Sequence, residues 1–366
     1  MMGKDTITLT RSIRLEIDLP TQEERQEAKS KLYQWRYRCH KAANLIVSHL
    51  YVQEMIQEFF YLSEGVKYKL VDEKKDELGI FNRSRMNTTY RLVSDRYKGK
   101  MPTNILSQLN SIIQSSFKKN REEYWKGERS LQNFKKEMAF PFTMEGVCGL
   151  EFNPEKSAFC FRFFSIPVKT YIGRAFNDKW KLMHQLTKGE IKMRTSYLKL
   201  KDGKIFMMAA FEMEKEKHQL RPEVFAEARL SLEYPIIVKI GKAKLSIGSR
   251  EEFLYRRLAI QAARRRTREG VKYARSGNGH KRKTKAAARF KDKERNYVNQ
   301  RLHVYSRELI DFCVKHQAGT LILVDQEQKI ELAKEEAFVL RNWGYYDLMT
   351  KIKYKAEKAG IELIIG

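Results

Sequence analysis

The sequence predicts an α+β protein of several domains, in which a small β-barrel is split by a helical block and followed by an α/β domain. Three observations lead to this prediction. A strand-like segment opens the chain, and helical periodicity follows it. Short apolar segments separated by turn residues then occupy residues 140–216. From residue 231 strand-like and helical segments alternate, which is typical of an α/β domain. The length of 366 residues suits two or three compact domains.

The first strand and the helical block are marked by local signals. Residues 6–19 alternate apolar and polar side chains, the pattern of a half-buried strand. Thr21 follows, and Glu24 three residues later completes a capping box for a helix. Helical periodicity reaches about residue 60, a charged segment that we interpret as a loop reaches about residue 101, and a second helix follows to Trp125. We therefore assign residues 21–138 to a helical lobe.

The barrel is predicted from residues 1–20 together with residues 139–230. Asp202-Gly203 is a strong hairpin signal between two of its strands. Short strands closed by hairpins favour a barrel of the oligonucleotide-binding type. The segments that we expect to be strands are 149–152, 158–164, 190–194, 197–200 and 204–213.

The α/β domain is predicted over residues 231–366. A long basic helical region lies in its middle, and its second half is amphipathic, with Val298, Leu302, Tyr305, Leu309 and Phe312 spaced by four and three residues. The other elements expected are strands at 235–240, 243–248, 320–324 and 361–365 and a helix at 345–358.

Composition points to a polyanionic partner. The chain has 72 Lys and Arg against 45 Asp and Glu, a net charge of +27. Such an excess repels itself unless nucleic acid neutralises it, although charge that only maintains solubility is an alternative. The four cysteines are scattered without a CxxC pair, so we expect small buried side chains in a reducing compartment. No signal peptide and no membrane span is apparent, so we expect a cytoplasmic protein without membrane contact.

The charge is concentrated in one segment. Residues 256–301 contain 17 Lys and Arg and three acidic residues, a net charge of +14. A run of this kind would neutralise several phosphates, and binding should weaken steeply with salt. A solvated helix face is the alternative. The candidate nucleic-acid-binding residues are Arg264, Arg265, Arg266, Arg268, Lys272, Arg275, Lys281, Arg282, Lys283, Lys285, Arg289, Lys291, Lys293 and Arg295. A second set, for RNA or duplex contacts, is Arg83, Arg85, Arg91 and Arg96.

The last third resembles a known family. Its motifs are RFKDKERN at 289–296, SRELI at 306–310, LILVD at 321–325, NWGYYDL at 342–348 and IKYKA at 352–356. In order and spacing they are similar to the RuvC domain of the TnpB transposon-associated nucleases and of the miniature type V (V-F-like) CRISPR effectors. The resemblance implies a wedge-like barrel (1–20 and 139–230), a helical recognition lobe (21–138) and a RuvC-like domain (231–366) without a C-terminal zinc ribbon. It also implies a guide RNA and a target DNA duplex as partners.

This sequence departs from the family pattern at the positions of the metal-binding carboxylates. The family has an Asp at the end of the first RuvC strand and a Glu at the end of the later strand, and we match these positions to Lys239 and Val324. A third Asp has no counterpart before the chain ends at Gly366. Catalysis with two metal ions needs converging carboxylates. We therefore expect an inactivated nuclease that is not an enzyme, with no catalytic residue, no metal and no cofactor. Asp325 and Glu327 lie near the expected site but are not expected to support catalysis.

The expected function is RNA-guided binding of DNA that controls transcription. Repression by occupancy and activation by recruitment of a sigma factor or RNA polymerase both stay open, as does a homodimer. Two alternatives remain: an RNA-guided endonuclease whose carboxylates come from elsewhere, and an unguided structural RNA-binding protein.

Overall fold

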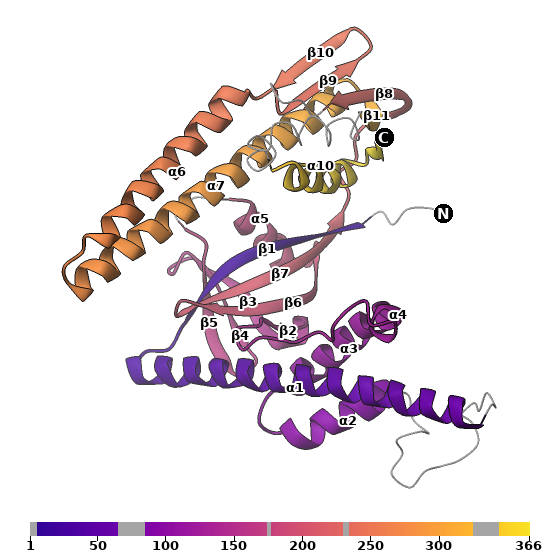
Figure 1. The fold of residues 1–366 in the computed structure, drawn as a ribbon, viewed down its shortest axis with the longest axis vertical. Helices are drawn as coiled ribbons and strands as arrows, with labels where there is room; N and C mark the ends of the chain where they lie inside the picture. Colours follow the sequence, from indigo (N-terminus) through magenta and orange to yellow (C-terminus); the bar gives the residue numbers. More distant parts are fainter. Residues whose placement is uncertain (1–5, 65–84, 174–176, 230–233, 325–343) are drawn as a thin grey trace. The chain divides into compact units, whose positions relative to one another are not determined.

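The chain folds into two compact units in a computed structural model, which describes residues 6–173, 177–229, 234–324 and 344–366 except for 65–84 (Figure 1). One unit comprises residues 8–213, and the other comprises residues 214–366 with the first seven residues. We call them the N-terminal and the C-terminal unit and describe each by itself. None of the helices within these described ranges is long and apolar enough to cross a bilayer.

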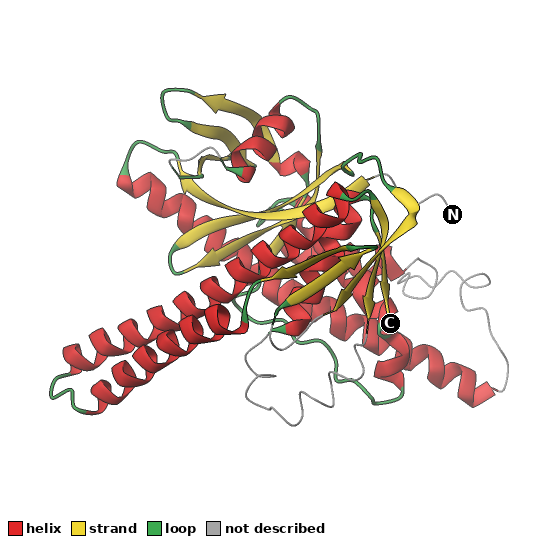
Figure 2. Ribbon diagram, turned by 90° about the horizontal axis from the view of Figure 1, so that it is seen from above, coloured by secondary structure: helices red, strands yellow, loops and turns green. Residues whose placement is uncertain are grey.

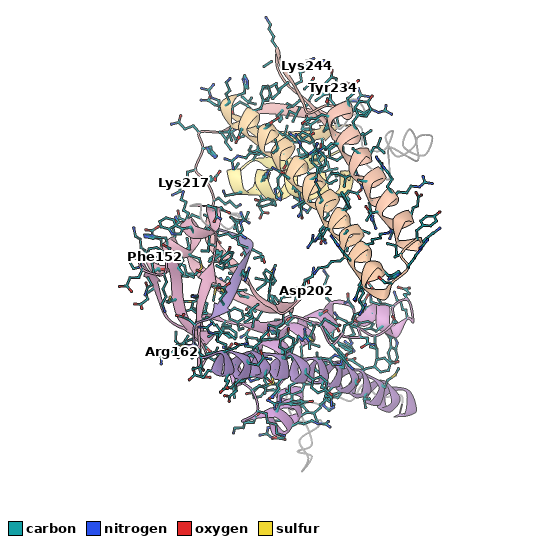
Figure 3. All side chains as sticks on the ribbon, turned by 90° about the vertical axis from the view of Figure 1, so that its left-hand side faces the viewer. Phe152, Arg162, Asp202, Lys217, Tyr234 and Lys244 are labelled. Carbon is teal, nitrogen blue, oxygen red and sulfur yellow. The ribbon has the colours of Figure 1, made fainter. Side chains whose placement is uncertain are left out.

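The N-terminal unit contains a curled sheet of seven strands, in the order β2-β6-β7-β1-β5-β4-β3. The predicted turn at Asp202-Gly203 is confirmed, because both residues have positive φ (49° and 72°) and join β6 to β7 (Figure 3). β5 was not predicted. The strands are β1 (Thr6–Ile17), β2 (Phe140–Phe142), β3 (Val147–Asn153), β4 (Ala158–Phe163), β5 (Ile166–Tyr171), β6 (Lys192–Lys201) and β7 (Lys204–Glu214).

A long helix begins where the capping box was predicted. The backbone N–H of Thr21 donates to Glu24 Oε2 at 3.2 Å, and the N–H of Glu24 donates to Thr21 Oγ1 at 3.2 Å. The segment interpreted as a loop contains a further helix, α2, which was missed. The helices of this unit are α1 (Gln22–Glu64), α2 (Arg85–Tyr97), α3 (Thr103–Lys119), α4 (Arg121–Trp125), the short 3-10 helix η1 (Met144–Gly146) and α5 (Asp178–Thr187).

Polar side chains attach the helices to neighbouring segments of the same unit. Asn44 on α1 donates to the carbonyl oxygen of Phe134 at 3.1 Å and accepts from its N–H at 2.9 Å. Asn104 on α3 accepts from the N–H of Thr143 at 3.1 Å, just beyond β2. These bonds satisfy backbone groups of an irregular segment, which would otherwise be costly to bury.

The C-terminal unit contains a five-stranded sheet in the order β10-β9-β8-β11-β12. β8 pairs in parallel with β11 and antiparallel with β9, and β11 pairs in parallel with β12. The strands are β8 (Arg221–Arg229), β9 (Ile236–Ile240), β10 (Ala243–Ile247), β11 (Ala318–Val324) and β12 (Glu362–Ile365). The helices are α6 (Arg250–Lys272), α7 (Gly277–Lys315) and α10 (Tyr345–Ala359).

The core of this unit confirms the amphipathic pattern predicted for the end of α7. Leu302, Tyr305 and Leu309 are buried, while Val298 and Phe312 pack against the same core. The sheet contributes small and branched side chains to it, among them Ala226, Ala228, Val238, Leu321 and Leu323. One half of α7 is therefore anchored in a packed domain, and the other half is the basic segment.

The cysteines follow the prediction in part. Cys39 and Cys313 are buried and Cys160 is half-buried, but Cys148 is exposed, so the expectation of a buried side chain is wrong there. Burial raises the pKa of the Cys313 thiol to about 12, so this thiol stays protonated at neutral pH.

Candidate nucleic-acid interface

The basic segment forms a hairpin of two long helices. α6 and α7 lie side by side along the basic segment, and a short turn joins them (Figures 1 and 2). Ser276 caps α7, because its Oγ accepts from the N–H of Gly279 at 3.1 Å. We call residues 256–301 the basic hairpin; it is a built element of the fold and not a loose tail.

An aromatic contact fixes the base of the basic hairpin. The rings of Phe253 and Tyr297 stack with centroids 6.2 Å apart, and the Tyr297 hydroxyl donates to the carbonyl oxygen of Glu252 at 3.0 Å. Arg301 forms an ion pair with the Glu252 carboxylate. Tyr297 and Arg301 come from α7 and the other two residues from α6, so these contacts hold the helices in one register.

A half-buried carboxylate holds the middle of the basic hairpin. Glu294 on α7 accepts from Arg257 Nε at 2.9 Å and from Gln261 Nε2 at 2.7 Å, and Arg264 Nη1 lies 3.9 Å away. Burial acts to raise the pKa of Glu294, but the hydrogen bonds and the nearby guanidinium groups hold it below its ordinary value. Glu294 is therefore ionised at neutral pH and offsets part of the positive charge between the helices.

The structure divides the predicted phosphate-binding residues into two groups. Arg264 and Lys283 are half-buried: Arg264 lies beside Glu294, and Lys283 Nζ donates to the carbonyl oxygen of Gly270 at 2.7 Å. Both side chains therefore hold the hairpin together. The other candidates are exposed, namely Arg265, Arg266, Arg268, Lys272, Arg275, Lys281, Arg282, Lys285, Arg289, Lys291, Lys293 and Arg295.

Two of the exposed arginines have local partners. Arg265 Nε lies 3.2 Å from Glu269 Oε1, and Arg295 Nη2 lies 2.7 Å from Asp292 Oδ1. Exposed pairs of this kind contribute only about 0.2–1 kcal/mol. A phosphate oxygen can therefore replace either carboxylate at little cost, and both arginines remain available.

Exposed aromatic side chains accompany the cations and were missed in the sequence. Tyr273, in the turn between the two helices, is 81% exposed, and Tyr255 on α6 is 67% exposed. Exposed rings beside cations are the platforms on which unpaired bases stack. The signal in the sequence is Tyr273 between Lys272 and Arg275, but only its exposure separates it from a core residue.

The second predicted set lies in the N-terminal unit. Arg83 is outside the described residues, and Arg85 is the first residue of α2. Arg91 and Arg96 are exposed on α2. The structure brings Arg96 together with residues that sequence reasoning did not select, because Arg38 and Lys41 on α1 line the same pocket.

The two positions that we matched to the family's carboxylates, Lys239 and Val324, do not lie on neighbouring strands. Val324 ends β11, but its register partner is Arg229, the last residue of β8. Lys239 lies on β9, on the other side of β8, where it pairs with Glu227 and with Lys244. Lys239 and Val324 are therefore separated by a strand. The difference arises because the first strand of this sheet is β8, which the sequence analysis assigned to the preceding barrel.

The two paired side chains at this strand end supply no oxygen ligand. Arg229 carries a positive charge and Val324 has no donor atom, whereas Mg²⁺ requires oxygen ligands. Within the described ranges no group of three or more His, Cys, Asp or Glu side chains is placed to hold a metal ion. Asp325 and Glu327 lie outside the described residues.

Comparisons with known proteins identify relatives. No protein-family model matches the chain. The chain is 25% identical over 281 residues to the CRISPR-associated endodeoxyribonuclease Cas12f1 of Sulfoacidibacillus thermotolerans, covering 71% of this chain and 64% of that protein. It is 32% identical over 111 residues to the enzyme of the same name from Syntrophomonas palmitatica, covering 30% of this chain and 22% of that protein. The chain thus spans less than two thirds of either relative.

A solved structure shows the same fold. It is a complex of Cas12f1 with a single guide RNA and target DNA, and the TM-score is 0.66 at 16% sequence identity. The match covers 98% of this chain and 89% of the Cas12f1 chain.

One prediction is contradicted by these comparisons. We expected a chain that is not an enzyme, but both curated relatives are named as endodeoxyribonucleases, so the family is enzymatic. The expectation was derived from the side chains of Lys239 and Val324, whereas Asp325 and Glu327, which follow Val324 in the chain, lie outside the described residues.

Proposed function

We propose that this chain, which is homologous to the Cas12f1 effectors, is an RNA-guided protein that binds double-stranded DNA. In this proposal a guide RNA reads one DNA strand by base pairing, while the protein holds the nucleic-acid backbones electrostatically. The partners are therefore a guide RNA and a target DNA duplex. The name of the solved relative, a complex with single guide RNA and target DNA, supports this pairing of partners.

The main support for nucleic-acid binding is the density of exposed cations on the basic hairpin. Residues 256–301 have a net charge of +14, and the contacts of Glu294 and Tyr297 hold them on two packed helices. Cations on a rigid element bind a phosphate backbone without first being ordered, so little entropy is lost. The binding should depend strongly on salt, because each neutralised phosphate releases counterions.

We further propose roles for the two units. The curled sheet of the N-terminal unit would act as the wedge-like barrel, and α1 to α4 as the recognition lobe. The C-terminal unit would act as the RuvC-like domain. Its support is the sheet itself, in which three parallel strands (β8, β11 and β12) are extended on one side by the antiparallel β9 and β10.

The test is binding of DNA by the full chain with its co-purified RNA. The RNA is sequenced, and a duplex matching its variable end is compared with a duplex mismatched over the first about 10 guide-paired positions. We expect the matched duplex to bind at least tenfold more tightly, equivalent to about 1.4 kcal/mol. Equal affinity for both duplexes would show that the protein binds nucleic acid without guidance.

Control of transcription is the consequence that we propose for such binding at a promoter. A bound complex blocks a polymerase, or it raises transcription if it recruits a sigma factor or RNA polymerase. The test is a reporter gene whose promoter matches the guide, compared with a promoter scrambled over the matched positions. Equal expression from both promoters would reject this role while leaving guided binding intact.

A further inference from the structure

A pocket on the recognition helices combines cations with an exposed ring. Gln34, Tyr37, Arg38 and Lys41 are spaced by three, one and three residues on α1, so they share one helix face. The end of α2 and the turn after it complete the pocket with Arg96, Tyr97 and Lys100. Its volume is about 340 Å³. We call these seven residues the α1–α2 pocket.

Hydrogen bonds fix the cations of the α1–α2 pocket. The guanidinium of Arg38 donates to the carbonyl oxygen of Lys100 and to Gln34 Oε1, the latter at 3.5 Å. Lys100 Nζ donates to the carbonyl oxygen of Arg96 at 3.2 Å. Arg38 therefore bridges α1 and the turn after α2, and the buried Tyr97 lines the same pocket. Arg38 and Lys100 are therefore held in place before any ligand arrives.

Among the residues that the structure describes, no carboxylate pairs with the cations of the α1–α2 pocket. Four cations line it, and none of its lining residues carries a carboxylate. Ion pairs of these four side chains are also absent among the salt bridges of the described residues. Four like charges in so small a space repel one another, and a bound anion relieves this repulsion.

Tyr37 adds an aromatic surface to the same pocket. Its side chain is 46% exposed, and Lys41 Nζ lies 4.7 Å from the ring centroid. The hydrogen bond and positive charge of Lys41 lower the pKa of the Tyr37 hydroxyl. The contact orients the ring while leaving part of its surface open. An apolar ring this exposed beside four cations is the combination that binds an unstacked base and its phosphate.

We propose that the α1–α2 pocket binds the phosphodiester backbone of a nucleic-acid strand and stacks one unpaired base on Tyr37. This inference deepens the proposed function, because it names a contact site outside the basic hairpin. An acidic protein segment would use the four cations but would gain little from the ring. The strand belongs either to the RNA or to an opened DNA duplex, since both supply the same backbone and base.

Two variants of the full chain test the site, each with a matched control. Lys41→Gln combined with Arg96→Gln removes two charges from the α1–α2 pocket. Lys181→Gln combined with Lys188→Gln removes two exposed charges from α5 and its C-terminal end. Tyr37→Leu removes the ring but keeps an apolar side chain, and Tyr37→Phe keeps the ring. Thermal unfolding verifies that every variant folds.

Binding is measured with fluorescent single-stranded RNA, single-stranded DNA and duplex DNA of unrelated sequence over a series of salt concentrations. The Lys41/Arg96 variant should reduce the slope of log K against log salt by about 1.4 for a single strand, or about 1.8 for a duplex, because two phosphate contacts are lost. The Lys181/Lys188 variant should leave the slope unchanged. Tyr37→Leu should weaken single-strand binding about 5- to 150-fold, and Tyr37→Phe should not.

The outcomes separate the sources and the alternatives. A loss confined to RNA assigns the site to the guide, and a loss confined to DNA assigns it to the target. Slopes that fall equally in the Lys41/Arg96 and Lys181/Lys188 variants would overturn the proposal. It would also be overturned if the pocket variants changed the oligomeric state and left nucleic-acid binding as in the wild type. Because the probes have unrelated sequence, these measurements stand even if guided binding by the wild-type protein fails.

Discussion

Arg229 and Val324 are register partners at the ends of two parallel strands of the C-terminal sheet. Paired residues on neighbouring strands lie about 5 Å apart and point to the same face. The side chains at positions 229 and 324 are therefore close enough to contact the same ligand. Lys239 is on β9, beyond β8, and does not share this edge with Val324.

This pairing predicts where carboxylates would create a metal site. Arg229→Asp with Val324→Glu places two acidic groups side by side, and we expect the double variant to gain affinity for Mn²⁺. The measurement is the melting temperature with and without Mn²⁺, and a metal concentration 100-fold above Kd would add about 2.7 kcal/mol. Lys239→Asp with Val324→Glu is the matched control. Equal stabilisation of both double variants would contradict the pairing.

Local signals in the sequence predicted local structure well. The capping box of Thr21 and Glu24 and the turn at Asp202-Gly203 depend on neighbouring residues alone, and both are present. β8 was missed because its fully buried side chains, Ala226 and Ala228, are small, and Val224 on the same face is only partly buried. Most of the residues on the other face are charged. β8 is a strand because it pairs with β9 and β11. Both strands follow it in the chain, and β11 is about 90 residues away.

The positive charge of the candidate interface was predictable from the sequence. Which of its cations are exposed and which are half-buried between the helices was not. The run of cations is visible in the sequence, yet nothing there shows that Arg264 lies beside Glu294 while Arg265 is exposed. That difference depends on the register of α6 against α7. The α1–α2 pocket was unpredictable for the same reason, since Arg38 and Arg96 meet only when two helices pack.

The Glu294 contacts predict a pH-dependent stability. Its pKa is lowered in the folded state, so its contribution is present above the ordinary pKa of 4.5 and is lost as the pH falls through the folded value. Glu294→Gln should lower the free energy of unfolding at pH 7 by about 1–3 kcal/mol, the cost of losing hydrogen bonds to a charged group. Urea unfolding over a range of pH values measures this, and the difference between variant and wild type should shrink in acid.

Glu269→Gln is the control for the Glu294 prediction. Glu269 faces Arg265 on the exposed side of α6, where an ion pair contributes at most about 1 kcal/mol. If Glu269→Gln destabilised the protein as much as Glu294→Gln, the half-buried contacts would have no special role.

Lys355 predicts a second rise of stability with pH, in the alkaline range. It is 9% exposed on α10, and its Nζ donates to Ser306 Oγ at 2.9 Å and to the carbonyl oxygen of His303. Burial, followed by the nearby charges of Arg307 and Lys351, lowers its pKa to about 8. The unfolded chain therefore holds this proton more tightly, and stability should rise as the pH increases from about 8 towards 10.5.

Lys355→Met tests this trend. It should remove the rise and stabilise the protein at pH 7 by on the order of 2 kcal/mol, because each unit of pKa shift is worth about 1.4 kcal/mol and some is lost with the hydrogen bonds. Lys353→Met, at an exposed position on the same helix, is the control. An unchanged pH profile in Lys355→Met would show that burial of the ammonium does not govern stability here.

The basic hairpin predicts separate roles for its exposed and half-buried cations. Lys281→Gln, Arg282→Gln and Lys285→Gln together remove three exposed charges from α7, and the slope of log K against log salt for duplex DNA should fall by about 2.7 if each binds a phosphate. Unfolding by urea should be nearly unchanged, since exposed substitutions shift stability by about 0.5 kcal/mol or less.

Arg264→Gln should show the reverse behaviour. Its guanidinium is 25% exposed and lies beside Glu294, so its loss should destabilise the hairpin while leaving the salt slope close to that of the wild type. Salt titrations and urea unfolding of both variants measure the two effects separately. If Arg264→Gln lowered the salt slope by about 0.9 without loss of stability, this arginine would be a phosphate contact after all, and the division between the two groups would fail.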